Sequence, residues 1–341
     1  MQGEIVSAGT LLDADGRLRE PGWARQPVFD TNLEQAATGL LGRWRVKRWD
    51  YYGIWTPKLF ASATLADLGY AGLAFFYVVD LVNRRCVEHT VTRMLGRGVT
   101  LPRNSDAGDA TYDDGKTRVA FRVFPGKRRL DVTDLMFDEG RGLRINVELD
   151  CPAAHESVVV ATPIGGGGFY YNRKLNSLPA RGSIAWGSRR VRVTPNVAVG
   201  QLDWGRGVWP YRSHWLWASA TGFLIGGRKF GLNLGAGFSD SGSEMENAIF
   251  VQGRLHKLGV VHFDFEPEDY RRPWYFADDD GRVDLELQPT VERVARTNFG
   301  IVRSDVHQVF GRYSGHVVTD DGETIDIDDL AGFAEEHHAR W

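Results

Sequence analysis

Apolar and polar residues alternate along many short stretches of the chain. Residues 144–150 alternate without a break, with Ile145, Val147 and Leu149 on one side and polar side chains on the other. A period of two is the pattern of a half-buried β-strand. The run 73–79 is apolar on both sides, as in a strand that is packed on two faces. Many such stretches, separated by Asp-Gly turns, favour an all-β sandwich or barrel.

Helical periodicity is scarce in this sequence. Residues 32–41 and residues 328–340 could each form one short helix, although Gly332 interrupts the second. We predict an extended N-terminal arm at 1–40, a first β-rich domain at 41–180 and a second at 181–341.

A short internal similarity suggests that the two β-rich domains are related. The sequence LFASAT at 59–64 nearly repeats as LWASAT at 216–221, and each copy follows a Trp-Pro cluster. Small residues are common, so the match alone is equally compatible with coincidence. Together with the similar layout of the two blocks, it favours two related barrels.

The composition limits the possible function classes. The 341 residues carry 41 basic and 44 acidic side chains, a net charge of −3, which provides no basic field for nucleic acid. No stretch approaches the roughly 20 apolar residues of a membrane helix, and the N-terminus lacks the features of a signal peptide. We therefore expect a cytoplasmic protein without an integral membrane segment. The oligomeric state is left open.

The sequence contains no motif for a metal ion or a cofactor. Its two cysteines, Cys86 and Cys151, lack zinc-site spacing and are expected to be buried free thiols. The glycine run at 165–168 lacks the ending of a phosphate loop and is interpreted as a flexible connection between the barrels. The segment Glu335-Glu336-His337-His338 matches no zinc protease motif and is interpreted as a solvated terminal segment. We expect neither a metal nor a cofactor.

The stretch from Asp203 to Ser219 concentrates the candidate chemistry. It holds four of the eleven tryptophans, together with an acid, two arginines, a tyrosine and a histidine. On a strand, Trp215, Trp217 and Ser219 share one face, and their indoles would form a flat apolar wall with N–H donors. Such a wall could bind a ligand or could close the end of a barrel, and both interpretations stay open.

Three residues of this stretch are candidates for catalysis. Asp203 and Arg206 are expected in a loop that glycines make flexible, and Tyr211 follows this loop. Burial in an apolar mouth would favour the protonated form of Asp203, which could then protonate an alkene or an epoxide. Arg206 and Tyr211 would orient the substrate. The alternative is a structural Asp–Arg pair that holds the loop.

The following strand, at 229–238, has one apolar face and one face made of glycines and Asn233. A face without side chains leaves room for a ligand or permits sharp coiling of the strand. Glu246 and Asn247, which open the next strand, form a second polar pair, with a solvated hairpin as the alternative. The predicted ligand-binding residues are Trp204, Trp209, Trp215, Trp217, Ser219, Asn233, Glu246 and Asn247.

These segments carry a resemblance to a known family. Residues 203–219, 231–238 and 246–248 resemble an uncharacterised bacterial family known as domain of unknown function 2804, and the resemblance extends from Gly9 to Trp341. That family is distantly similar to the lipocalin-like group of carotenoid hydratase (hydroxyneurosporene synthase) and AttH. The resemblance implies two packed calycin-type barrels and an isoprenoid, polyketide or acyl ligand. It transfers no catalytic residues to this chain.

The sequence thus predicts an all-β protein of two lipocalin-like barrels that binds a hydrophobic small molecule in an aromatic-lined pocket. The alternative is a cofactor-independent hydratase, cyclase or isomerase of an isoprenoid-like or polyketide-like substrate, with a carboxylic acid as proton donor. A third possibility is a structural or protein-interaction domain whose aromatic residues form its core.

Overall fold

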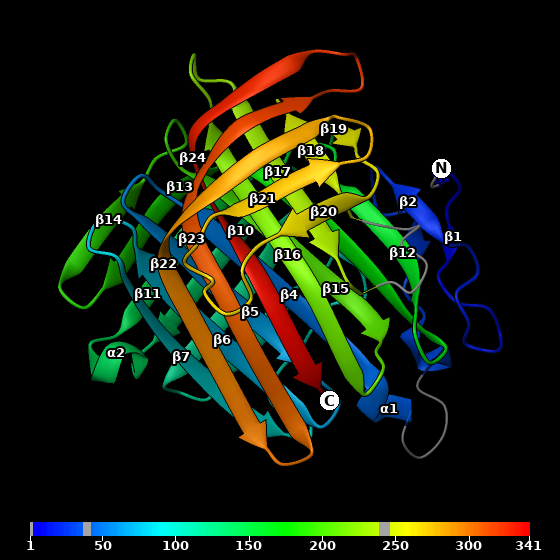
Figure 1. Ribbon diagram of the computed structural model, residues 1–341. Helices are drawn as coiled ribbons and strands as arrows, with labels where there is room; N and C mark the ends of the chain where they lie inside the picture. Colours follow the sequence, from blue (N-terminus) through cyan, green and yellow to red (C-terminus); the bar gives the residue numbers. More distant parts are fainter. Residues whose placement is uncertain (1–2, 37–41, 239–245) are drawn as a thin grey trace.

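The computed structural model describes residues 3–36, 42–238 and 246–341, and nearly all of its regular structure is β (Figure 1). The helical elements in these residues are short, namely η1 (Leu33–Gln35), α1 (Gly42–Arg45) and α2 (Phe137–Gly140). The expected helix at 328–340 is wrong, because this segment lies within the strand Thr324–Arg340. Of the expected helix at 32–41, η1 forms at its start, and residues 37–41 lie outside the described residues.

The strands form two large sheets and one small ladder. The first sheet has 13 strands. They are β2 (Gly22–Ala24), β4 (Val46–Trp55), β5 (Leu59–Asp67), β6 (Ala71–Asp80), β7 (Arg85–Met94), β8 (Ala110–Asp113), β9 (Thr117–Phe124), β10 (Lys127–Asp134), β11 (Leu143–Asp150), β12 (Val158–Ile164), β13 (Gly168–Trp186), β14 (Arg189–Val193) and β15 (Val199–Val208). In the N-terminal arm, β1 (Gly9–Thr10) pairs in parallel with β3 (Phe29–Asp30).

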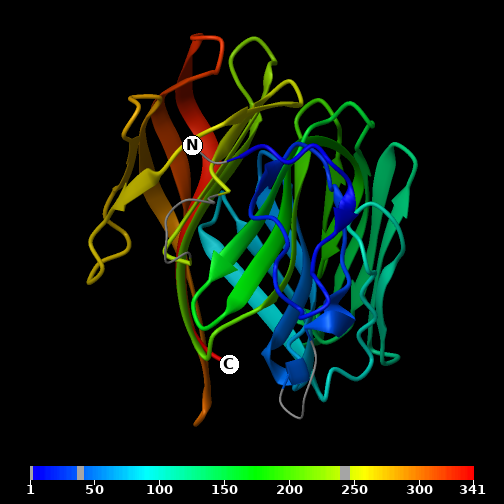
Figure 2. The ribbon, with the colours of Figure 1, turned by 90° about the vertical axis from the view of Figure 1, so that its right-hand side faces the viewer.

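The second sheet has nine strands in the order β19-β18-β17-β16-β24-β23-β22-β21-β20. They are β16 (Arg212–Phe223), β17 (Lys229–Ala236), β18 (Ala248–Val251), β19 (Arg254–Lys257), β20 (Val261–Asp264), β21 (Trp274–Asp278), β22 (Val283–Phe299), β23 (Val302–Val318) and β24 (Thr324–Arg340). Both sheets are strongly curled, and Figure 2 shows them packed against each other as two half-barrels. The predicted all-β fold of two lipocalin-like barrels is confirmed.

The chain passes from the first sheet to the second between Val208 and Arg212. The predicted domain border at residue 180 therefore falls inside β13, and β14 and β15 also belong to the first sheet. The glycine run at 165–168 forms the tight turn between β12 and β13, where Gly166 and Gly167 have positive φ. It is a hairpin turn within one sheet and not a connection between the two.

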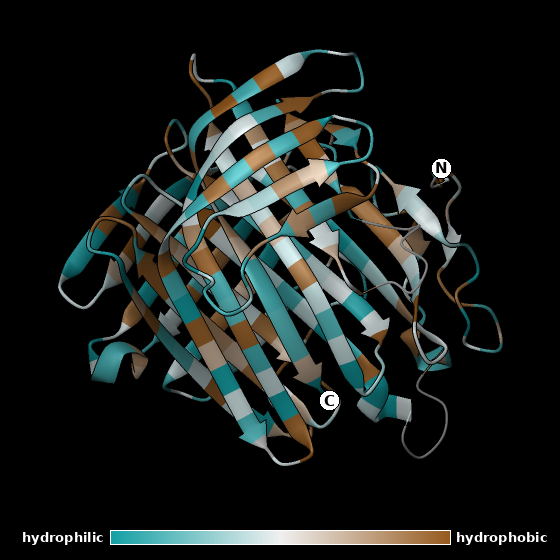
Figure 3. Cartoon of the chain, in the orientation of Figure 1, coloured by the Kyte–Doolittle hydropathy of each residue, from teal (hydrophilic) through white to brown (hydrophobic). Residues whose placement is uncertain are grey.

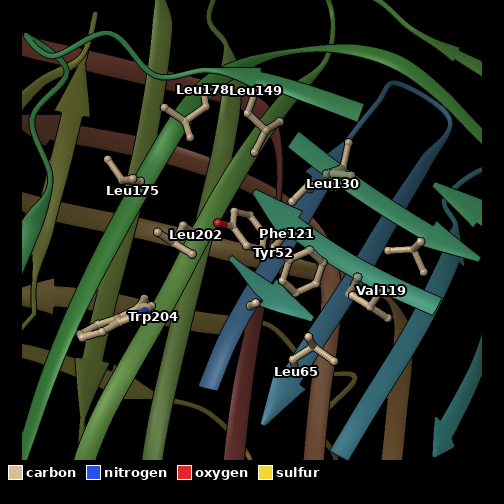
Figure 4. Packing of buried hydrophobic residues seen from close by; sticks show 14 of the residues in the cluster. Tyr52, Leu65, Val119, Phe121, Leu130, Leu149, Leu175, Leu178, Leu202 and Trp204 are labelled. Carbon is tan, nitrogen blue, oxygen red and sulfur yellow. The ribbon is translucent and has the colours of Figure 1, made fainter. Parts of the chain in front are cut away.

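Each half-barrel has its own apolar core. Figure 4 shows part of the first core, where Tyr52, Phe121 and Trp204 pack among leucines and valines. The second core is built around Trp274, Phe276 and their neighbours. Along β22 and β23, hydrophobic and hydrophilic residues alternate, as Figure 3 shows, because one face of the sheet packs inward and the other faces outward.

A third apolar cluster joins the two sheets, and the similar hexapeptides meet there. Ala61 of the first copy lies in the first core and Ala218 of the second copy lies in the second core. Phe60 and Trp217, which are equivalent in the alignment of the copies, both belong to the cluster between the sheets. The two copies thus take matching positions in their half-barrels.

The glycine face of β17 allows the sheets to approach closely. A Cβ atom on Gly231 would lie 2.6 Å from the Cβ of Asn176 and 2.7 Å from the Oγ of Ser177. These two residues form an irregular step in β13, where the backbone N–H of Ser177 donates to Thr221 Oγ1 over 2.8 Å. At this position the glycine permits close packing of the two sheets, which differs from both sequence-based interpretations, room for a ligand and sharp coiling of the strand.

Gly231→Ala is therefore expected to lower the free energy of unfolding by about 1–3 kcal/mol, because the added methyl group overpacks the contact between the sheets. Urea denaturation of both proteins measures this difference. Gly9→Ala is the control, since its Cβ would meet only the Phe29 ring at 3.9 Å. An equal effect of the two substitutions would contradict the proposed role of Gly231.

Candidate functional site

Strands β13 and β15 alternate their side chains between the core of the first half-barrel and the second sheet. Tyr171 and Leu175 of β13 belong to the first core. Asn172 and Lys174 point to the opposite side, toward the second sheet, because neighbouring residues of a strand face opposite ways. Asp203 of β15 lies directly across from Lys174 in the antiparallel register. This pairing brings a lysine and an acid together between the two sheets.

Lys174 stands at the centre of a buried charge cluster. Its Nζ lies 3.0 Å from Oδ1 of Asp203 and 3.1 Å from Oε1 of Glu246. Oε2 of Glu246 accepts a hydrogen bond of 2.7 Å from Nδ2 of Asn172. The backbone carbonyl of Glu246 accepts from Nδ2 of Asn233 over 2.9 Å. We call Asn172, Lys174, Asp203, Asn233 and Glu246 the charge cluster.

The charge cluster holds one cation and two acids away from water. Burial favours the protonated acid, so the pKa of Glu246 is raised, and the nearby charge of Asp203 adds to this effect. Burial acts against the charged form of Lys174, but the two carboxyl groups outweigh it and raise the pKa of the lysine. The arrangement therefore favours the charged ammonium of Lys174 and makes the carboxyl group of Glu246 a weaker acid than usual.

Trp217 connects this cluster to the second sheet. The ammonium of Lys174 lies 4.5 Å from the centre of the Trp217 ring, a cation–π contact. The indole N–H donates to Oδ1 of Asn233 over 2.9 Å. Ser219, on the same face, donates to the backbone carbonyl of Leu232. The predicted residues Trp217, Ser219, Asn233 and Glu246 thus lie together, with Asp203 beside them.

A group of aromatic rings adjoins the charge cluster between the sheets. Trp209 lies 5.0 Å from Tyr170 and 5.6 Å from Trp215, and Trp49 stacks on Tyr170 at 5.4 Å, measured between ring centres. The indole N–H of Trp209 is buried and has no hydrogen-bond acceptor among the described residues. The aromatic cluster consists of Trp49, Tyr170, Trp209, Trp215, Phe238 and Trp341.

Tyr170 and Glu335 link the two clusters. Burial raises the pKa of Tyr170 well above its ordinary value, and the charges of Asp203 and Glu246 contribute in the same direction. On β24, Oε1 of Glu335 accepts a hydrogen bond of 3.3 Å from the Trp215 indole. The Glu335 side chain is only 10% exposed, and its burial raises its pKa to about 7. A carboxyl group with this pKa can donate a proton at neutral pH.

The structure separates the three predicted catalytic residues. Asp203 and Arg206 lie within β15 and not in a loop, and they point to opposite faces of that strand. Arg206 lies in the first half-barrel, where its guanidinium donates to Asp50 Oδ1 over 2.9 Å and covers the Trp204 ring at 4.1 Å. Tyr211 is half-exposed, and its hydroxyl donates to the backbone carbonyl of Ile301. The three side chains do not converge on one point.

Two further predicted ligand-binding residues lie away from the charge cluster. Trp204 packs into the first core, in edge-to-face contact with Tyr171. Asn247 bridges two backbone segments by hydrogen bonds. Its Oδ1 accepts from the N–H of Gly235, and its Nδ2 donates to the carbonyl of Gly259. The contacts of Asn247 account for it without a ligand, whereas the indole N–H of Trp204, like that of Trp209, is buried and has no acceptor among the described residues.

The sequence analysis missed Lys174, Tyr170 and Glu335. A lysine within the run Phe169 to Leu175 was a detectable signal, because that run reads as a buried strand in which an unpaired ammonium is costly. Glu335 lies in the segment that was interpreted as a solvated terminus. That interpretation is wrong for Glu335, which is buried on β24 between the sheets.

Among the described residues, one surface cleft has a volume of about 470 Å³ and another has a volume of about 420 Å³. Arg206, Arg48 and Asp67 line the first, together with residues of the N-terminal arm. His214 and His338 line the second. None of the four tryptophans of the 203–219 stretch lines either cleft.

The comparison with protein families identifies the family. The model of the family described as domain of unknown function (DUF2804) matches residues 2–341. The chain belongs to this family, as the resemblance in its sequence implied. A search of the curated proteins found no match.

Three solved structures with TM-scores of 0.50 or more share the fold, and a fourth structure is similar at a lower score. CghA has a TM-score of 0.56 and 11% identity, over 100% of this chain and 97% of that chain. CghA with Sch210972 also has a TM-score of 0.56, with 10% identity over 86% of this chain and 88% of that chain. An AttH-like protein of Nitrosomonas europaea has a TM-score of 0.50 and 14% identity, over 87% and 94% of the two chains. Kievitone hydratase from Nectria haematococca has a TM-score of 0.48 and 11% identity, over 86% and 88% of the two chains.

At these identities the comparison establishes the fold and transfers no residue roles. It shows that this chain shares the fold of the AttH-like protein and of CghA, the architecture that the resemblance implied. In the described part of the chain, no helix has the length and apolar character needed to cross a membrane.

Proposed function

We propose that this member of the DUF2804 family binds a hydrophobic small molecule between its two sheets, where the aromatic cluster adjoins the charge cluster. The observation that carries the proposal is this adjacency of indole rings and buried ionisable groups. Apolar walls with a few fixed polar groups are typical of small-molecule sites. An isoprenoid, polyketide or acyl-type ligand with one oxygen function fits this combination.

One detail supports this location, and a second shows what binding requires. The buried indole N–H of Trp209 lacks an acceptor, and an oxygen atom of a ligand would satisfy it. The rings of Tyr170, Trp209 and Trp215 are in contact, so an entering ligand must move some of them apart. CghA, a protein of the same fold, was crystallised with Sch210972.

The test is a titration of tryptophan fluorescence with retinol, a carotenoid and palmitic acid. We expect at least one of them to quench, and Trp209→Phe to weaken its binding roughly tenfold, or about 1.4 kcal/mol. Trp274→Phe is the matched control, because Trp274 is equally buried but lies in the second core. Failure of all three probes, or equal losses in both variants, would contradict a ligand site between the sheets.

The buried carboxyl group of Glu335 favours a second candidate function, a cofactor-independent hydratase, cyclase or isomerase. In this mechanism, Glu335 donates its proton to an alkene carbon or an epoxide oxygen of the bound substrate. The cation that develops is stabilised by the Trp215 and Trp217 rings. Water or a π bond of the substrate then adds to the cation, and the proton that is released returns to the Glu335 carboxylate. Atoms and charge balance without a cofactor.

In this scheme Glu335 takes the role of proton donor that the sequence analysis assigned to Asp203. Asp203 lies 3.0 Å from the ammonium of Lys174 and is proposed to hold that lysine in place. We expect Glu335→Gln to leave the affinity for a substrate nearly unchanged and to abolish its conversion, measured by chromatography of the products. Glu148→Gln on β11 is the control, since Glu148 pairs with Lys127 on the first sheet. Full conversion by Glu335→Gln would exclude this donor.

A further inference from the structure

Outside the charge cluster, β16 begins and β24 ends at the bottom of Figure 1, and these two strand ends include residues whose side chains can bind metal ions. His214 of β16 lies directly across from His338 of β24, and Glu336 is two residues before His338 on the same face. Four of the nine histidines of the chain, at 214, 307, 337 and 338, lie on these ends of β16, β23 and β24.

The three side chains converge on one carboxylate oxygen. Nε2 of His214 lies 3.0 Å and Nε2 of His338 lies 3.2 Å from Oε1 of Glu336. The two imidazole rings stack, with their centres 4.4 Å apart. One ligand atom from each residue lies within 4.8 Å of the other two, and in the described ranges no other group of three such residues has this geometry.

We infer that His214, Glu336 and His338 form a binding site for a divalent transition-metal ion such as Zn²⁺. Two imidazoles and one carboxylate are a ligand set suited to zinc and related ions, and not to Mg²⁺ or Ca²⁺, which prefer oxygen ligands. The site was invisible in the sequence because 122 residues separate His214 from Glu336. It lies on the face of β24 opposite to Glu335, so it is independent of the proposed ligand site.

A second layer of contacts supports this assignment. The Tyr270 hydroxyl donates to Oε2 of Glu336, which leaves Oε1 directed at the two histidines. A hydrogen bond to the remaining oxygen of a ligating carboxylate is common in metal sites, and it fixes the orientation of the ligand. Tyr270 is itself held by stacking on His307, with ring centres 4.2 Å apart.

The surroundings indicate what completes the coordination. Three protein ligands leave a position open, as in catalytic zinc sites. His214 and His338 line the cleft of about 420 Å³, which Arg212, Arg303 and Arg340 also line. Asp305 also lines the cleft and lies 3.4 Å from Arg303, so Arg212 and Arg340 are the cations that repel a bare dication and attract an anion. We infer that the open position takes an anionic ligand, such as a carboxylate or phosphate group, from the cleft.

The test uses the untagged full-length protein after removal of metal with EDTA. We expect one equivalent of Co²⁺ per chain to produce ligand-field absorption bands, and Zn²⁺ to abolish them by competition. Substitutions of the ligands, His214→Ala, Glu336→Gln and His338→Ala, should weaken binding by more than about 100-fold. Tyr270→Phe should weaken it by roughly 10-fold, the lower end of the range for outer contacts. Inorganic phosphate should change the Co²⁺ spectrum.

His262→Ala is the matched control, because exposed His262 also contacts a carboxylate, with Nε2 2.8 Å from Asp279. Its Co²⁺ affinity should equal that of the unsubstituted protein, and circular dichroism shows whether each variant is folded. Absence of the absorption bands, or bands that persist in the folded ligand variants, would overturn the assignment. An equal loss in His262→Ala would do the same, since it would indicate surface binding of the ion.

Discussion

Lys174→Met is expected to lower the free energy of unfolding by about 3–5 kcal/mol, the largest effect that we predict for a single substitution. The lysine is the one cation within 4 Å of Asp203 and Glu246 among the described residues. Methionine has a similar shape but no charge, so both buried acids would lose their partner. Urea denaturation at pH 7, followed by fluorescence, measures the change.

Removal of the acids should restore most of this loss. In the triple variant Lys174→Met, Asp203→Asn and Glu246→Gln, no charge is left uncompensated, and we expect a stability well above that of Lys174→Met alone. Lys127→Met is the surface control, because Lys127 pairs with Glu148 at 3.0 Å but is 45% exposed. Its expected cost is below about 1 kcal/mol. If both single variants cost the same, Lys174 does not stabilise the charge cluster.

The strands of this protein were predictable where the signal is local. Residues 144–150 form β11 with the expected alternation of buried and exposed positions. The Asp-Gly pairs at 114, 280 and 321 lie in turns between neighbouring antiparallel strands. In each case a period of two or a turn residue suffices, and no distant contact decides the outcome. The common face of Trp217 and Ser219 followed from the same rule.

The predictions failed where a distant contact decides the outcome. Polar side chains at 328–340 suggested a helix or a solvated end, yet β24 lies between β16 and β23 in the middle of the second sheet. Its alternation sends Glu335 toward the first sheet and Glu336 toward the opposite face. No local pattern distinguishes these two neighbouring acids, because the difference arises from the sheet that packs on one side. Asp203 and Arg206 are a second example, because their side chains point to opposite faces of β15 and no local pattern predicts which face is which.

Burial of Glu335 should therefore make the stability of the protein depend on pH. The folded-state pKa of Glu335 is about 7, above its ordinary value of 4.5. Between these two values the folded state binds more protons than the unfolded state, so stability falls as the pH rises. At about 1.4 kcal/mol for each pH unit, the loss reaches about 3 kcal/mol at pH 7. Because Gln does not ionise, Glu335→Gln should become more stable than the unsubstituted protein by this amount.

The measurement compares each variant with the unsubstituted protein from pH 4.5 to pH 8, by urea denaturation with EDTA present. The comparison is necessary because His337, whose pKa burial lowers to about 3, contributes stability that is lost as the pH falls below its ordinary value of 6.5. This contribution cancels in the difference. Glu323→Gln is the control, since hydrogen bonding to Arg228, whose guanidinium stays charged over this range, lowers the pKa of Glu323.

Above pH 5.5, the Glu323 carboxylate is ionised in the folded state and largely ionised in the unfolded state. The difference between Glu323→Gln and the unsubstituted protein should thus stay nearly constant from pH 5.5 to pH 8, while the difference for Glu335→Gln rises with pH and levels off above 7. Parallel curves for the two variants would mean that β24 does not bury Glu335 between the sheets. Glu335 would then lack the raised pKa on which its proposed role as proton donor depends.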